Sequence, residues 1–141
     1  MEKLEYKKYL RYAHLGPEDV RIWDKFIETH PDYFQMVAYD VKVGKGREYP
    51  ESEMPEVKED LVYLSKKRID VVGFKGEDVF VIEIKPKANL SAVGQAFGLA
   101  ELYRDEFGSG RRIVPVIITD EKIPDMEALC SRMGVLYLLC S

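Results

Sequence analysis

The spacing of hydrophobic residues changes along the chain between intervals typical of helices and the alternation typical of strands. Val20, Trp23 and Ile27 repeat at helical intervals. They follow Gly16-Pro17-Glu18-Asp19, where proline suits the first helical position and the acidic residues suit the positive end of the helix dipole. The sequence therefore predicts a first helix that begins here and ends near His30-Pro31.

Strand patterns dominate the next part of the chain. Residues 33–43 are β-branched or aromatic with a weak alternation and end at Gly44-Lys45-Gly46, which predicts a first strand and its closing turn. Residues 68–74 and 79–85 are two short apolar runs around Lys75-Gly76-Glu77-Asp78, the pattern of a β-hairpin. Both runs are apolar on both faces, so these strands are expected at the centre of a covered sheet. The expected faces are Ile69, Val71, Ile82 and Ile84 on one side, and Val72, Phe74, Val79 and Val81 on the other.

The remaining segments complete an α/β pattern. Residues 49–60 contain two prolines and several acids, and are expected to make an irregular excursion over the surface. A nearly apolar helix is expected over residues 91–107, where Gly94 and Gly98 would let it lie close on the sheet. A strand, a helix and a strand are expected over residues 113–119, 124–133 and 135–139. The order α-β-β-β-α-β-α-β predicts one α/β domain over residues 1–141, with a mixed central sheet flanked by helices.

Composition narrows the class of protein. With 141 residues and 46% hydrophobic residues, the chain can bury a real core. It lacks an apolar run near the roughly 18 residues of a membrane span, and its charged N-terminus is unlike a secretion signal, so a cytoplasmic protein without membrane contact is expected. The two cysteines have no partners at metal-ligand spacing and are expected to be buried apolar groups.

The net charge of −4 argues against a protein that coats nucleic acid through bulk positive charge. Local cations could still meet phosphates, although each cluster taken alone is more typical of a solvated surface. The two clusters are Lys42, Lys45 and Arg47, and Lys66, Lys67 and Arg68.

The hairpin turn sets a register that brings two acids together. A two-residue loop at Gly76-Glu77, with glycine first as a type II′ turn prefers, puts Asp70 opposite Glu83. Facing carboxylates destabilise a strand pair, and a divalent cation such as Mg²⁺ would relieve them. Lys85 lies on the same face as Glu83, and Pro86 keeps the backbone of Lys85 extended to the end of the strand.

These residue types suit the hydrolysis of a phosphodiester. A metal withdraws charge from the phosphate and lowers the pKa of a bound water, while Lys85 can position that water and stabilise developing negative charge. Gln95, on the following helix, could hydrogen-bond the water or a phosphate oxygen. On spacing alone, Glu83 and Lys85 are equally well explained as an ion pair at a strand end.

Arg68-Ile69-Asp70, a hairpin, Glu83-Ile84-Lys85 and a helix bearing Gln95 form a D-x12-E-x-K pattern. This pattern resembles the PD-(D/E)XK nuclease superfamily, which includes restriction endonucleases, archaeal Holliday-junction resolvases and many phage nucleases. Ile69 stands where the proline of the family name would be. The resemblance implies a restriction-endonuclease-like core. It assigns Mg²⁺ or Mn²⁺ binding to Asp70, Glu83 and the backbone carbonyl of Ile84, and catalysis to Asp70, Glu83, Lys85 and Gln95.

The resemblance implies a metal-dependent nuclease that acts on nucleic acid, with DNA the expected substrate. Some branches of the family add an acid from the first helix, for which Glu18, Asp24 and Glu28 all remain open here. Members often pair two subunits to cut two strands, so a homodimer is an expectation from the resemblance alone. The alternative is a catalytically inactive binding or assembly protein that keeps the nuclease fold. A small-ligand domain has less support, because the chain has no glycine-rich phosphate loop.

Overall fold

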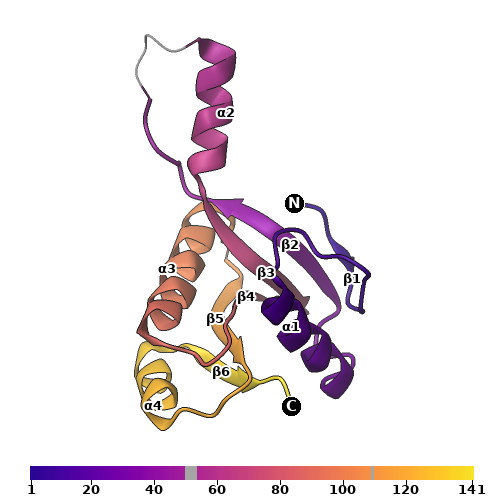
Figure 1. The fold of residues 1–141 in the computed structure, drawn as a ribbon. Coiled ribbons are helices and arrows are strands. Elements are labelled where there is room, and N and C mark those ends of the chain that lie inside the picture. Colours follow the sequence, from indigo (N-terminus) through magenta and orange to yellow (C-terminus); the bar gives the residue numbers. More distant parts are fainter. Residues whose placement is uncertain (50–53, 109) are drawn as a thin grey trace.

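A six-stranded mixed sheet forms the centre of the structure, in the order β1-β2-β3-β4-β5-β6 (Figure 1). The computed structural model describes residues 1–49, 54–108 and 110–141. Neighbouring strands from β1 to β4 are antiparallel, and β4, β5 and β6 run parallel. The strands are β1 (Leu4–Glu5), β2 (Met36–Val43), β3 (Lys67–Lys75), β4 (Asp78–Ile84), β5 (Arg112–Thr119) and β6 (Leu136–Leu139). The α/β fold class expected from the sequence is confirmed.

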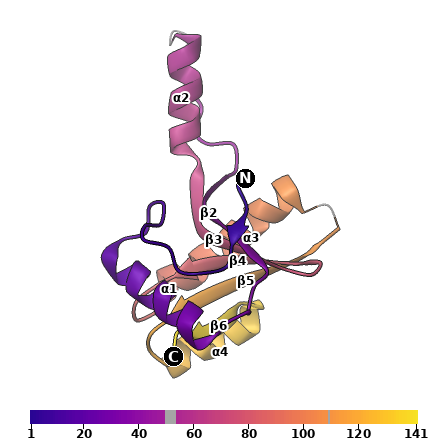
Figure 2. The same cartoon turned by 90° about the vertical axis from the view of Figure 1, so that its right-hand side faces the viewer.

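Helices cover both faces of the sheet, and one further helix projects from it (Figures 1 and 2). Helix α1 (Pro17–Thr29) packs on one face, while α3 (Leu90–Phe107) and α4 (Pro124–Met133) lie on the other. Helix α2 (Pro55–Ser65) extends away from the sheet and buries none of its residues. Within the described part of the chain, no helix combines the length and apolar character needed to cross a bilayer.

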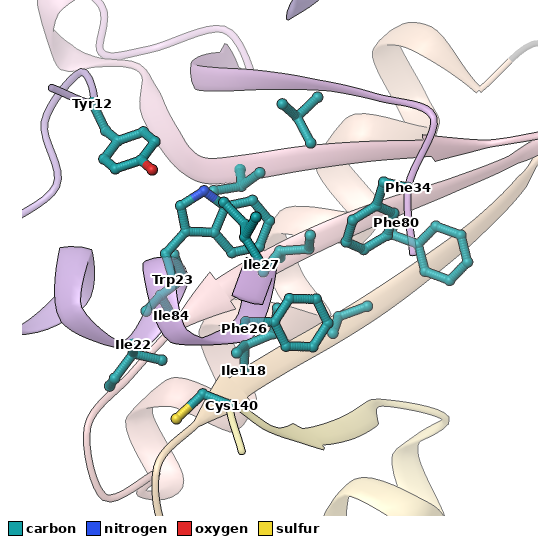
Figure 3. Close-up of a cluster of buried hydrophobic side chains, with 14 residues drawn as sticks. Tyr12, Ile22, Trp23, Phe26, Ile27, Phe34, Phe80, Ile84, Ile118 and Cys140 are labelled. Atoms are coloured by element: carbon teal, nitrogen blue, oxygen red, sulfur yellow. The ribbon is translucent and has the colours of Figure 1, made fainter. Parts of the chain in front are cut away.

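The core under α1 is rich in aromatic side chains (Figure 3). The rings of Trp23 and Phe26 stack with their centres 5.8 Å apart. The indole N–H of Trp23 donates to the Tyr39 hydroxyl at 2.9 Å, so this large buried ring leaves no polar atom without a partner. This layer fixes α1 against the sheet, and therefore fixes where the first turn of α1 lies.

The β3–β4 hairpin has the predicted register. Lys75 lies opposite Asp78, and the pairing continues to Val71 opposite Ile82. Gly76 has a positive φ of 59°, whereas Glu77 is not among the positive-φ residues, as a type II′ turn requires.

The predicted face of Ile69 is wrong. Ile69 packs with the cluster that contains Val72, not with the cluster that contains Val71. The β2–β3 pairing passes over Asp40, which lies in the left-handed region with a φ of 52°. This conformation interrupts the alternation of an extended strand.

Two further expectations about elements are also wrong. The excursion expected over residues 49–60 contains the start of α2, which begins at Pro55 in the first helical position; residues 50–53 lie outside the described part of the chain. Gly94 and Gly98 do not bring α3 close to the sheet, because a Cβ on either would meet no atom within 4 Å. The side of α3 that packs inward carries alanines instead, namely Ala92, Ala96 and Ala100.

Candidate active site

Asp70 and Glu83 occupy the open end of the β3–β4 hairpin, opposite its turn. The observed register ends at Val71 and Ile82, which places Asp70 and Glu83 at the next position along the two strands. The backbone N–H of Ile84 donates to Asp70 Oδ2 at 3.0 Å. The carboxylate of Asp70 is therefore held against β4 beside Glu83.

Both carboxyl groups are half-buried, and their surroundings disfavour negative charge. Burial raises the pKa of Asp70, with the charge of Asp19 adding to the shift and the Ile84 N–H opposing it. Burial raises the pKa of Glu83 further, because the charges of Asp70 and Asp19 also act on it while Lys85 opposes them. The pair can reduce this cost by binding either a proton or a cation.

Lys85 continues the line of β4 just beyond its last residue. Its backbone N–H donates to the carbonyl of Ile118 at 3.0 Å, which extends the pairing with β5 by one residue. Burial raises the pKa of both Glu83 and Asp19, and the positive charge of Lys85 opposes that rise. The structure therefore brings the charges of Asp70, Glu83 and Lys85 together at this end of the hairpin.

Asp19, in the first turn of α1, belongs to the same electrostatic group. Its charge acts on both Asp70 and Glu83, although its place in the sequence indicated only the start of a helix. The three acids left open there have other surroundings. Glu18 is exposed, Asp24 accepts a hydrogen bond from Tyr12, and Glu28 pairs with Lys8 at 2.6 Å. The acidic residues at the start of α1 were the one feature of the sequence that could have pointed to Asp19.

Gln95 lies on the exposed side of α3, near the start of the helix. Its side-chain nitrogen donates to Ser91 Oγ at 3.5 Å rather than to a group of the acidic site. Gln95 and Arg68 line one surface hollow of about 580 Å³. The assignment of Gln95 to catalysis remains a prediction from the resemblance.

A second polar cluster, which sequence reasoning missed, borders the site through Arg68. His14 Nε2 lies 3.2 Å from Asp40 Oδ2, and Arg68 Nε lies 3.4 Å from Asp40 Oδ1. Arg68 also contacts His14 Nδ1 at 2.8 Å. The charge of Asp40 acts to raise the pKa of Asp70, and the charge of Arg68 acts to lower it. This cluster therefore influences how readily Asp70 becomes ionised.

Asp120 fixes the loop that follows Lys85. One carboxylate oxygen accepts the backbone N–H of Lys87 at 2.9 Å, and the other accepts from Arg21 of α1 at 2.9 Å. The next residue, Ala88, donates its N–H to the buried Thr119 hydroxyl. The end of β4, the start of α3 and the helix that carries Asp19 are thereby tied to the end of β5.

The available ligands for a cation are few. Among the residues that the structure describes, no three His, Cys, Asp or Glu side chains form a group able to hold a metal ion. A divalent cation that prefers one or two carboxylates together with water would still fit the Asp70 and Glu83 pair. Burial raises the pKa of both carboxyl groups, and a bound cation would offset the cost of their negative charge.

Comparison with known proteins identifies the fold. No family model and no curated protein matches the chain. A repair endonuclease from Pyrococcus abyssi matches 93% of this chain, with 18% identity and a TM-score of 0.55. A structure of an EndoMS–dsDNA complex matches 94% of it, with 17% identity and a TM-score of 0.52. The chain spans 50% and 48% of these two structures. It therefore shares the fold of about half of each.

Proposed function

We propose that this chain is a divalent-metal-dependent nuclease of the PD-(D/E)XK type that hydrolyses phosphodiester bonds of DNA. The observation that carries the proposal is the half-buried pair of Asp70 and Glu83, with Lys85 at the end of the same strand as Glu83. The two structures of similar fold are a repair endonuclease and an EndoMS–dsDNA complex, which supports DNA as the proposed substrate.

Asp70 and Glu83 would hold the cation, joined by the backbone carbonyl of Ile84. Mg²⁺ or Mn²⁺, when bound here, would supply Lewis acidity to the scissile phosphate and would lower the pKa of a water molecule. The carboxylates suit the task because burial and mutual repulsion leave them in need of positive charge. Asp19 adds a third negative charge to the surroundings of the pair.

Lys85 has a separate task at the reacting phosphate. Its ammonium group is a compact positive charge that can orient the attacking water and stabilise negative charge that develops in the transition state. Two hydrogen bonds hold the strand end that carries Lys85. Its own backbone N–H donates to Ile118, and the N–H of Lys87 donates to Asp120. Such groups contribute most when the fold positions them before the substrate arrives.

The deciding experiment measures cleavage and affinity side by side for wild type and Lys85→Ala. Plasmid, single-stranded, branched and RNA substrates are incubated with Mg²⁺, Mn²⁺ or EDTA. If Lys85 acts on the transition state, its removal should lower cleavage by orders of magnitude and leave affinity in place. Lys75→Ala is the matched control, because Lys75 is an exposed lysine at the opposite end of β3.

An inactive binding protein would give a different result. Wild type would bind nucleic acid but cut none of the substrates with either metal, and Lys85→Ala would only weaken binding modestly. That outcome would replace the nuclease proposal with the binding one.

A further inference from the structure

The base of helix α2 gathers two clusters of cations that are far apart in the sequence. Lys42 of β2 lies opposite Arg68 of β3, and Val43 lies opposite Lys67. The gathered cations are Lys42, Lys45, Arg47, Lys66, Lys67 and Arg68. Among ion pairs between described residues, Arg68 is the one member of this set that takes part, through Asp40. The region therefore gathers six cationic side chains on a chain of net negative charge.

An exposed aromatic ring lies among these cations. Tyr63, in the last turns of α2, is 55% exposed. The ammonium groups of Lys42 and Lys66 lie 5.6 Å and 6.0 Å from the centre of its ring. All three residues line a hollow of about 380 Å³, which the acidic residues Glu2, Asp40 and Glu106 also border. An accessible ring flanked by lysines is the arrangement that stacks an unpaired base and contacts the adjoining phosphates.

The position of this ring is set by close packing between the last turns of α2 and the chain that leaves β2. We call this projecting part of the molecule, from the end of β2 to the start of β3, the arm. Gly46 has a φ of 74°, and a Cβ there would meet the carbonyl oxygen of Val62 at 2.5 Å. The backbone N–H of Arg47 donates to Ser65 Oγ at 2.7 Å, and that hydroxyl donates to the Val62 carbonyl at 2.7 Å. The last turns of α2 are thus tied to the chain that leaves β2, as the base of the arm in Figure 1 shows.

The cationic surface leads directly to the acidic site. Arg68 precedes Asp70 by two residues on β3, and Lys66 precedes it by four. At about 3.3 Å per residue the path from Lys66 to Asp70 is roughly 13 Å long, or about four nucleotides of one duplex strand. The first turns of α2 carry Glu56, Glu59 and Asp60, which would repel phosphates and limit contact to the base of the arm.

We propose that the base of α2 binds the DNA strand next to the cleavage point, with Lys42, Lys66 and Arg68 on its phosphates and Tyr63 stacked on an unpaired base. This inference rests on the proposed nuclease function and names its substrate class, which is DNA with a single-stranded or branched portion. A fully paired duplex offers no free base face to Tyr63, because its bases already stack on each other.

The test measures binding of the full chain in EDTA to labelled single-stranded, forked and blunt duplex DNA at several salt concentrations. Tyr63→Ala should weaken binding to single-stranded and forked DNA by about 5- to 150-fold and leave blunt duplex binding unchanged. Tyr63→Phe keeps the ring and should bind as wild type does. Lys66→Ala should lower the salt dependence by about one phosphate contact. Lys75→Ala is the control, since Lys75 also lies over a tyrosine ring, Tyr33, but at the hairpin turn.

The outcomes separate this inference from the proposed function. If wild type cleaves DNA but Tyr63→Ala binds all three substrates like wild type, or loses all three equally, the stacking surface is wrong and the nuclease stands. If wild type cleaves nothing but binds forked DNA through Tyr63, the surface stands and the nuclease is wrong. Wild type that binds no DNA at low salt overturns both.

Discussion

Two half-buried carboxyl groups at one site, Asp70 and Glu83, make the metal-free protein sensitive to pH. Their pKa values lie above the ordinary carboxyl values near 4, chiefly because of burial. Above about pH 4 the unfolded chain releases these protons while the native state keeps them, so stability falls as pH rises. The contribution is fully present at lower pH and is lost as the pH passes through the raised pKa values.

Asp70→Asn should flatten this fall, because it removes one of the two titrating groups. Each pH unit crossed while the native state holds one extra proton costs about 1.4 kcal/mol of unfolding free energy. Urea unfolding in EDTA over a series of pH values measures the slope. The control is Glu121→Gln, a change at an exposed acid. An equal slope in Asp70→Asn and wild type would contradict the raised pKa.

Asp19 is expected to support the site without being needed for the fold. Its charge acts on Asp70 and Glu83, and it is only half-buried. Asp19→Asn should lower metal-dependent cleavage by about 10- to 100-fold, the usual effect of removing a group that supports metal ligands. The melting temperature should stay close to that of wild type. Glu18→Gln changes the exposed neighbouring acid and should retain activity. Equal activity losses in both variants would assign the effect to the helix end instead.

The sequence predicted the part of the site that depends on one hairpin. A two-residue turn fixes which residues of two adjacent strands face each other, so Asp70, Glu83 and Lys85 could be placed by register. Asp19 and Asp40 could not be placed in this way. Their positions depend on how α1 and β2 pack against the hairpin, and Asp40 also adopts a left-handed conformation that no strand pattern indicates.

At the scale of single elements, the hairpin depends on one glycine. Gly76 has a φ of 59°, and a Cβ there would meet no atom within 4 Å, so alanine would strain only the backbone. Gly76→Ala should lower the unfolding free energy by about 1–2 kcal/mol, the cost of a left-handed non-glycine residue. Gly94→Ala is the matched control in α3, where alanine should raise stability by about 0.5–1 kcal/mol. Urea unfolding compares the two, and a stable Gly76→Ala would contradict the type II′ turn.

Elements with a buried face were the ones that could be predicted. Helix α4 has the predicted bounds, and α3 begins one residue earlier than predicted. Helix α2 buries no residue, so no apolar face stood out, although Pro55-Glu56 repeats the start pattern of Pro17-Glu18. The alternation rule failed at Ile69 for a different reason, because the irregular backbone at Asp40 lies beside it.

At the scale of the whole molecule, the site lies where the layers on the two faces of the sheet meet its strand ends. Helix α1 supplies Asp19 from one layer, whereas Gln95, on α3 in the other layer, contacts Ser91 of its own helix. Arg21 and Asp120 join α1 to the end of β5 across this region. The sequence predicted the layers, because apolar residues on both faces of the hairpin require cover on both sides. It did not predict the direction of α2, because none of the residues of this helix is buried against the sheet.

Because the acidic pair exists only in the folded chain, metal binding should stabilise the whole molecule. Mn²⁺ at 100 times its dissociation constant would add about 2.7 kcal/mol by mass action if the unfolded chain does not bind it. The melting temperature of wild type should therefore rise with Mn²⁺ and return to its starting value when EDTA is added.

The rise should be absent in Asp70→Asn, which loses a ligand, and should persist in Lys85→Ala, which loses none. It should also grow with pH, since Mn²⁺ must displace protons that the raised pKa values of Asp70 and Glu83 keep bound at lower pH. Thermal melts of the three proteins at two pH values measure all of these effects. If Mn²⁺ raised the melting temperature of Asp70→Asn as much as that of wild type, the cation would bind elsewhere. The proposal that Asp70 and Glu83 hold the metal would then be wrong.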